Sequence, residues 1–161
     1  MSAALCLVES QIRLPDYNLD SSIRDRVIAR MVKNMSIDED VARRAFDGAI
    51  QFLRACAVPE GRRLAPSHLA DEAWHTFLLY SKPYTDFCQS MGVDYLHHDP
   101  CDLPGSMEPG TYARTREYLC GLYADLDTEI WPEDGERDWG HAQGCCNSDH
   151  GQRSSCRCGG G

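Results

Sequence analysis

Several features that would quickly assign this chain to a class are missing from its sequence. No apolar run approaches the roughly 20 residues that span a bilayer, so we predict no membrane segment. Only 16 Lys and Arg stand against 25 Asp and Glu, and this shortage of cations disfavours nucleic acid as a partner. There is also no G-x-S-x-G, P-loop or G-x-G-x-x-G motif, so hydrolase-elbow, nucleotide and Rossmann sites lack their starting residues.

The composition that remains is typical of one soluble globular domain. The 161 residues are enough for a single core but not for two ordinary domains, and 42% of them are hydrophobic. The N-terminus carries no basic residue before Arg13 and no small-residue cleavage site. We therefore interpret it as unprocessed and expect a cytoplasmic protein.

The nine cysteines are unevenly placed. A disulfide scaffold would spread its pairs through the fold, whereas here four cysteines crowd the C-terminal end and the others are scattered. Scattered single cysteines are most often small buried apolar groups. We predict that Cys56, Cys88 and Cys120, which stand at apolar positions of predicted helices, serve only in packing.

Apolar residues recur at three- and four-residue spacing in five segments, which predicts an all-α fold. The expected helices run from Ser21 to Met35, from Ser36 to just before Pro59, from the N-cap Ser67 to before Lys82, from Pro83 to Met91, and from Thr111 to about Leu126. Ser36 and Glu39 form an S-x-x-E capping box, and Gly92 ends the fourth helix. Residues 93–96 are compatible with an extended strand, and we expect a loop over 97–109.

We expect two parts in the chain. Residues 1–126 form a compact, bundle-like helical domain, and residues 127–161 form an acidic linker with a disordered Cys/Gly-rich tail. Between Asp125 and Asp138 seven acids stand against one base, and from Gly140 onward there is no large apolar residue that could support a core. The acidic stretch and the tail are candidates for recruiting a protein partner.

One pair of residue types on the third predicted helix has the spacing of metal ligands. Asp71 and His75 are four residues apart and project from one helix face. His97, His98 and Asp99 follow after a short helix, and at most one of two adjacent histidines in an extended segment can meet that face. Imidazole with carboxylate suits zinc, or iron and manganese when oxygen ligands are added.

The same residues also permit an interpretation without metal. Asp71 would then cap local amides, His75 would be a hydrogen-bonded core histidine, and His97 with His98 would close a turn before Pro100. From the spacing alone both interpretations stay open, because a D-x-x-x-H pair is common by chance.

A longer pattern carries a family resemblance. The sequence D-E-A-W-H-T-F-L-L from Asp71, then Tyr84, Phe87-Cys88, Gly92 and L-H-H-D-P, resembles the bacterial and plant glycine-rich-domain-containing-protein-like family. The resemblance implies an all-helical domain in which Asp71, Trp74, His75 and His98, with His97 or Asp99, surround one site. Two departures stand out: many relatives have a second histidine where this chain has Phe77, and the glycine-rich tail is reduced to Gly159–Gly161.

Trp74, beside His75, also has two interpretations. It is most simply a core residue that buries a large area and uses its indole N–H in a hydrogen bond. It can also wall the ion site with its ring and so take part in cofactor binding, and both roles can hold together.

The tail offers a second, separate candidate for metal binding. Four thiols and one imidazole fall within fourteen residues, a set that suits Cu(I) or zinc although its spacing is unlike a zinc finger. These residues are Cys145, Cys146, His150, Cys156 and Cys158. Adventitious exposed thiols and tail disulfides are the alternatives.

The leading hypothesis is a small helical metal-binding protein that holds a divalent ion at Asp71, His75 and His98, with a cysteine tail for soft metal. Whether it is an enzyme stays open. The competing hypothesis is an interaction or scaffold module whose Asp/His motif is a metal-free polar network.

Overall fold

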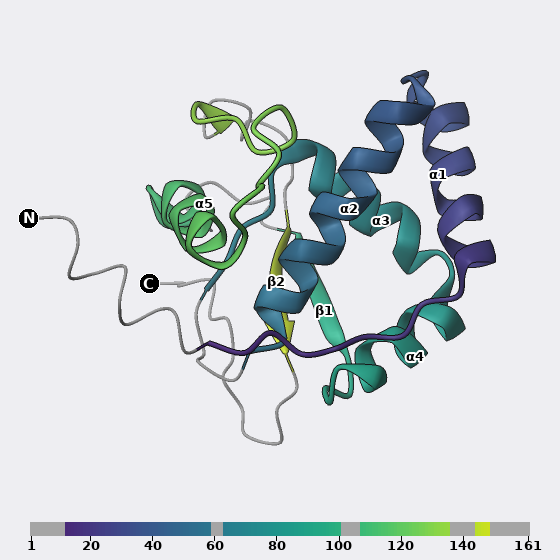
Figure 1. Cartoon of the computed structure of the whole chain (residues 1–161), viewed down its shortest axis with the longest axis horizontal. Helices are drawn as coiled ribbons and strands as arrows, with labels where there is room; N and C mark the ends of the chain where they lie inside the picture. Colours follow the sequence, from purple (N-terminus) through teal and green to yellow (C-terminus); the bar gives the residue numbers. More distant parts are fainter. Residues whose placement is uncertain (1–11, 59–62, 101–106, 136–143, 149–161) are drawn as a thin grey trace, which may run out of the picture.

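The computed structural model describes residues 12–58, 63–100, 107–135 and 144–148. Within these ranges the chain forms five helices and a small two-stranded sheet, which confirms the predicted helical class (Figure 1). The elements are α1 (Ser21–Met35), α2 (Glu39–Cys56), α3 (His68–Leu78), α4 (Ser81–Ser90), β1 (Leu96–Pro100), α5 (Thr111–Leu122) and β2 (Gly144–Ser148). None of these helices combines the length and apolar character needed to cross a membrane.

Helix α2 is the centre of the fold. Helices α1 and α3 pack along it, and β2 and α5 also contact it (Figure 1). More than half of its eighteen residues are buried, so its apolar stripe is wide enough to meet several neighbours. Trp74 of α3 and Trp131 both lie against Phe52 of α2, with ring centroids 5.7 and 6.1 Å away. These aromatic contacts join α3 to the segment that follows α5.

Two helix-end predictions are confirmed. The Ser67 hydroxyl accepts a hydrogen bond from the backbone N–H of Ala70 at 3.3 Å, as an N-cap residue does. Gly92 follows the end of α4 with a φ of 83°, a left-handed conformation that glycine adopts without steric cost. Helix α5 begins at Thr111 as predicted but ends at Leu122, four residues before the expected position.

The capping box at Ser36 is wrong. Ser36 has φ 55° and ψ 40°, so it lies in the left-handed region and closes α1 by donating its N–H to the carbonyl of Val32. An N-cap residue needs an extended backbone, and Asp38 supplies it at φ −64° and ψ 147°. The short link between α1 and α2 therefore uses Ser36 to end the first helix, not to start the second.

The loop expected over 97–109 is wrong in its first part. Residues 96–100 form β1, which pairs antiparallel with β2 in a register from Leu96↔Ser148 to Pro100↔Gly144. Strand β2 belongs to the segment expected to be a disordered tail, and it is the part of that tail that the structure describes. The ladder supplies backbone hydrogen bonds, which require no apolar side chain in either strand. The tail beyond Ser148 lies outside the described residues.

The hydrophobic core continues past residue 126. Ile130 and Trp131 are 1% and 0% exposed, and both pack against α2 at Gly48. A Cβ at Gly48 would lie only 2.8 Å from Cγ2 of Ile130, so this close approach requires glycine. The division of the chain at residue 126 stays a prediction, but at least these two residues after it belong to the core.

Arg44 of α2 fastens the same segment. Its guanidinium donates to Asp127 at 3.0 Å and to Glu129 at 2.7 Å. Burial acts to raise the pKa of Asp127, but hydrogen bonds from Arg44 and from the backbone N–H groups of Glu129 and Ile130 outweigh it and lower that pKa. Part of the acidic stretch is thus engaged within the fold.

The three helical cysteines differ from one another. Cys88 is buried and free, as predicted, and burial raises the pKa of its thiol. Cys120 is exposed, so its packing role is wrong: it stands on the solvent side of α5. Cys56 is buried but disulfide-bonded, which corrects the prediction that it only packs.

Candidate metal centre

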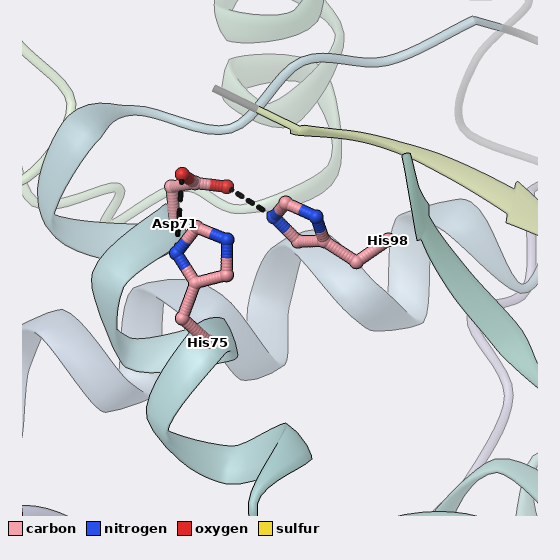
Figure 2. A group of neighbouring side chains, drawn as sticks. All are labelled: Asp71, His75 and His98. Atoms are coloured by element: carbon pink, nitrogen blue, oxygen red, sulfur yellow. Dashed lines mark hydrogen bonds and ion pairs between the residues drawn. The ribbon is translucent and has the colours of Figure 1, made fainter. Parts of the chain in front are cut away.

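Three side chains from two elements meet at one point. Asp71 and His75 lie one turn apart on α3, and β1 brings His98 to them (Figure 2). Oδ1 of Asp71 is 2.9 Å from Nε2 of His98, and Oδ2 is 3.5 Å from Nδ1 of His75. The two imidazole rings lie with their centroids 4.0 Å apart. The carboxylate therefore bridges the two histidines, one oxygen to each.

The site is closed on one side and open on the other. The side chains of Asp71 and His98 are 2% and 7% exposed, whereas that of His75 is 40% exposed. A carboxylate withdrawn from water this far needs hydrogen-bond donors or a cation to offset the lost hydration. His98 supplies one such hydrogen bond and His75 lies within ion-pair distance, and a bound cation would compensate the carboxylate more strongly.

The spacing of these atoms fits the donor set of a metal ion. One ligand atom from each of the three residues can be chosen so that all lie within 4.8 Å of one another. In a tetrahedral zinc site with bonds of about 2.0 Å, neighbouring ligand atoms are about 3.3 Å apart. The two distances from Asp71, one from each of its oxygens, lie on either side of that value, and the 4.8 Å limit exceeds it, so the three side chains would have to draw together around an ion.

The other two candidate ligands of β1 lie outside this group. Among the described residues, neither His97 nor Asp99 belongs to the cluster. Side chains alternate along a strand, so His98 faces α3 while His97 is exposed on the other side, with its ring 4.7 Å from that of Tyr95. The prediction that at most one of the two histidines meets Asp71 is confirmed.

Trp74 has a core position and also forms a wall beside the cluster. It is 0% exposed, and its ring centroid lies 4.4 Å from that of His98. Its indole N–H donates to the hydroxyl of Tyr84 at 2.9 Å, and this hydroxyl donates to the carbonyl of Leu96 at 2.6 Å. Both readings of Trp74 from the sequence, core residue and neighbour of the site, describe its position.

Tyr84 is the positioning residue that spacing arguments missed. Burial raises the pKa of its phenol, so the hydroxyl stays protonated and can donate to Leu96. Through this bond α4 holds the first residue of β1, two positions before His98. The only sequence signal was the tyrosine in the family pattern.

Of the five candidate ligands in the tail, the structure describes the backbone of only Cys145 and Cys146. The backbone register places Cys146 opposite His98 and Cys145 opposite Asp99. His150, Cys156 and Cys158 lie outside the described residues. A separate soft-metal site in the tail therefore stays a prediction.

Among known proteins, no curated protein and no solved structure matches the chain. Residues 10–114 match the family described as UCP032817-like. This match spans α1 to β1 and includes all three residues of the cluster. The description names no reaction and no ligand, and the glycine-rich-domain resemblance stays a prediction beside it. The matched range exceeds half of the sequence, and the chain belongs to the UCP032817-like family.

Proposed function

We propose that the protein binds one divalent metal ion through Asp71, His75 and His98. The observation that carries the proposal is the convergence of two imidazoles and one buried carboxylate from α3 and β1, with ligand atoms within 4.8 Å of one another. Residues 71 and 98 are far apart in sequence, so the fold itself creates this donor set.

The donor set favours zinc. Two nitrogens and one oxygen are borderline ligands that zinc accepts in tetrahedral geometry. Iron or manganese would need further oxygen ligands, which water can supply on the exposed side of His75. Three protein ligands with one side open is also the arrangement of catalytic zinc sites, in which the ion lowers the pKa of a bound water. The proposal includes a metalloenzyme role as its extension, with no substrate assigned.

A metal-free network is the second candidate, and one observation favours it. The 2.9 Å contact between Asp71 and His98 is already a good, part-buried hydrogen bond, and the His98 ring lies against Trp74. Such a network would fix β1 on α3 without any ion, and the protein would then act as an interaction or scaffold module. The two candidates differ in whether stability depends on metal.

The remaining expectations from the sequence concern the tail, the partners and the location. We propose that the tail cysteines bind soft metal, Cu(I) or zinc, and that the acidic stretch and tail contact a protein partner and not a nucleic acid. The disulfide at Cys56 is uncommon in the reducing cytoplasm and speaks against the cytoplasmic location expected from the sequence. The engagement of Asp127 and Glu129 with Arg44 leaves less of the acidic stretch available for a partner. The resemblance to the glycine-rich-domain-containing-protein-like family supports an Asp/His site.

Thermal unfolding with and without chelator tests the ion. Binding to the native state alone adds about 2.7 kcal/mol at a hundredfold excess over Kd, or roughly 5–10 °C in Tm for a chain of this size. We expect chelator to lower the Tm of the wild-type protein and to leave His75→Ala unmoved. His68→Ala is the matched control, because His68 is exposed on the same helix and lies outside the cluster.

Two results would contradict the ion site. Chelator could leave the wild-type Tm unchanged, which would favour the metal-free network. Alternatively, chelator could lower the Tm of His75→Ala as much as that of the wild type, which would assign the ion to other residues, the tail cysteines first.

A further inference from the structure

The strand that carries His98 is attached to the helical core at two points. The carbonyl of Leu96 accepts the Tyr84 hydroxyl, and the ring of His98 bonds to Asp71. Leu96 itself is 0% exposed. One face of β1 is therefore held by α3 and α4, and an ion at the cluster would replace the hydrogen bond between His98 and Asp71 with coordination bonds to both residues.

Strand β2 contacts the rest of the domain through β1 and α2. It pairs with β1 over all five residues, and it also packs against α2. Figure 2 shows the two strands side by side next to His98. A two-stranded ribbon is at best marginally stable by itself, so the docking of β2 depends on how firmly β1 is fixed.

We propose that ion binding at Asp71, His75 and His98 is coupled to the docking of β2 on β1. This inference rests on the proposed ion site and names a form of regulation for it. His98 links the two events, because its side chain belongs to the cluster and its backbone pairs with β2. An ion that ties β1 to α3 reduces the motion of the strand on which β2 pairs. By thermodynamic reciprocity, docked β2 strengthens ion binding by the same factor, roughly five- to a hundredfold.

The coupling has a chemical consequence for the C-terminal segment. The register sets Cys146 opposite His98 and Cys145 opposite Asp99, so the docked segment brings two cysteine positions beside the ion site. The ion thus determines whether this cysteine-bearing segment is held on the domain or released from it. The protein becomes a metal-responsive switch for the presentation of its own C-terminal segment.

Hydrogen exchange of the full-length protein, with its disulfide at Cys56 intact, tests the coupling with zinc as the probe. Zinc should slow amide exchange in peptides covering residues 144–148 in the wild type and in His68→Ala. Zinc should not slow that exchange in His75→Ala, because this variant lacks one of the three proposed ligands. His75 lies on α3 and belongs to neither strand, so the substitution does not itself change the ladder. The α3 peptides of the same samples report whether zinc binds the cluster at all.

Each outcome has a distinct meaning. If zinc protects α3 but not residues 144–148 in the wild type, the coupling is wrong and the ion site stands. If zinc protects residues 144–148 equally in His75→Ala, the protection arises from the tail alone and the coupling is again wrong. If zinc changes neither region, both the ion site and the coupling fail.

A reciprocal experiment perturbs β2 and measures the ion. Asn147 pairs with His97 in the register, and proline there removes a backbone N–H and disfavours the strand. We expect Asn147→Pro to weaken zinc binding at the cluster roughly five- to a hundredfold. Asn147→Ala keeps the backbone N–H and should leave the zinc affinity near the wild-type value. Equal zinc affinity in the two variants would overturn the coupling.

Discussion

Replacing Tyr84 by phenylalanine removes one hydroxyl that hydrogen-bonds to two buried groups and also interacts with the buried thiol of Cys88. The indole N–H of Trp74 loses its acceptor at 2.9 Å, and the carbonyl of Leu96 loses its donor at 2.6 Å. All three residues are 0% exposed, so water cannot take the place of the hydroxyl without rearrangement. Each buried polar group left unpaired costs about 1–3 kcal/mol, so the two groups together predict that Tyr84→Phe destabilises the protein by about 2–6 kcal/mol.

The assay is urea unfolding, with the free energy of unfolding extrapolated to water. Tyr80→Phe is the matched control, since the hydrogen bond from its hydroxyl to the carbonyl of Arg26 is exposed, 3.4 Å long and worth about 0.5 kcal/mol or less. Zinc affinity gives a second readout. Tyr84→Phe should lower it because Leu96 anchors the strand that carries His98, whereas Tyr80→Phe should not.

A difference in unfolding free energy of less than about 0.5 kcal/mol between Tyr84→Phe and Tyr80→Phe would refute this reasoning. It would mean that the Trp74 and Leu96 groups find other partners. Tyr84 would then not be the residue that fixes the beginning of β1.

Three further predictions concern the core, the acidic segment and the cysteines. Gly48→Ala should destabilise by about 1–2 kcal/mol in urea unfolding, because a methyl placed 2.8 Å from Ile130 costs more than the better helix propensity of alanine returns; a gain in stability would contradict this packing. Hydrogen bonding lowers the pKa of Asp127 below 3.8 against the opposing effect of burial, so its carboxylate adds stability above pH 3.8 that is lost as pH falls through the folded pKa. Asp127→Asn should therefore have a free energy of unfolding about 1 kcal/mol lower than that of the wild type at pH 7. Urea unfolding at several pH values should show this difference shrinking as the pH falls, and a difference independent of pH would contradict the role of the Asp127 carboxylate. Thiol alkylation followed by peptide mass spectrometry should modify exposed Cys120 quickly and buried Cys88 slowly, and equal rates would contradict the assigned burial.

The helices could be predicted because their signals are local. Amphipathic spacing and the cap at Ser67 act within a few residues, and the i, i+4 relation alone placed Asp71 and His75 on one face. The meeting of His98 with this pair is a tertiary contact, so spacing could not supply it, and only the family pattern suggested it. At Ser36 the S-x-x-E pattern failed because the residue adopts the left-handed conformation that ends α1, which the pattern does not reveal.

The sheet could not be predicted from either strand. Leu96–Pro100 and Gly144–Ser148 lack an apolar alternation, and each depends on backbone pairing with a distant segment. Ile130 and Trp131 were missed for a related reason, because two apolar residues in an acidic stretch have no periodicity and their burial depends on the space left at Gly48. The role of Tyr84 likewise exists only once α3, α4 and β1 are assembled.

The central claim is that Asp71, His75 and His98 hold an ion, and counting zinc tests it most directly. Full-length wild type, His98→Ala and the adjacent control His97→Ala would be purified without an affinity tag, reconstituted with zinc, freed of excess metal and analysed for bound zinc. The account predicts that wild type and His97→Ala each retain one more zinc ion per chain than His98→Ala, whatever the tail binds. The same zinc content in all three proteins would contradict it.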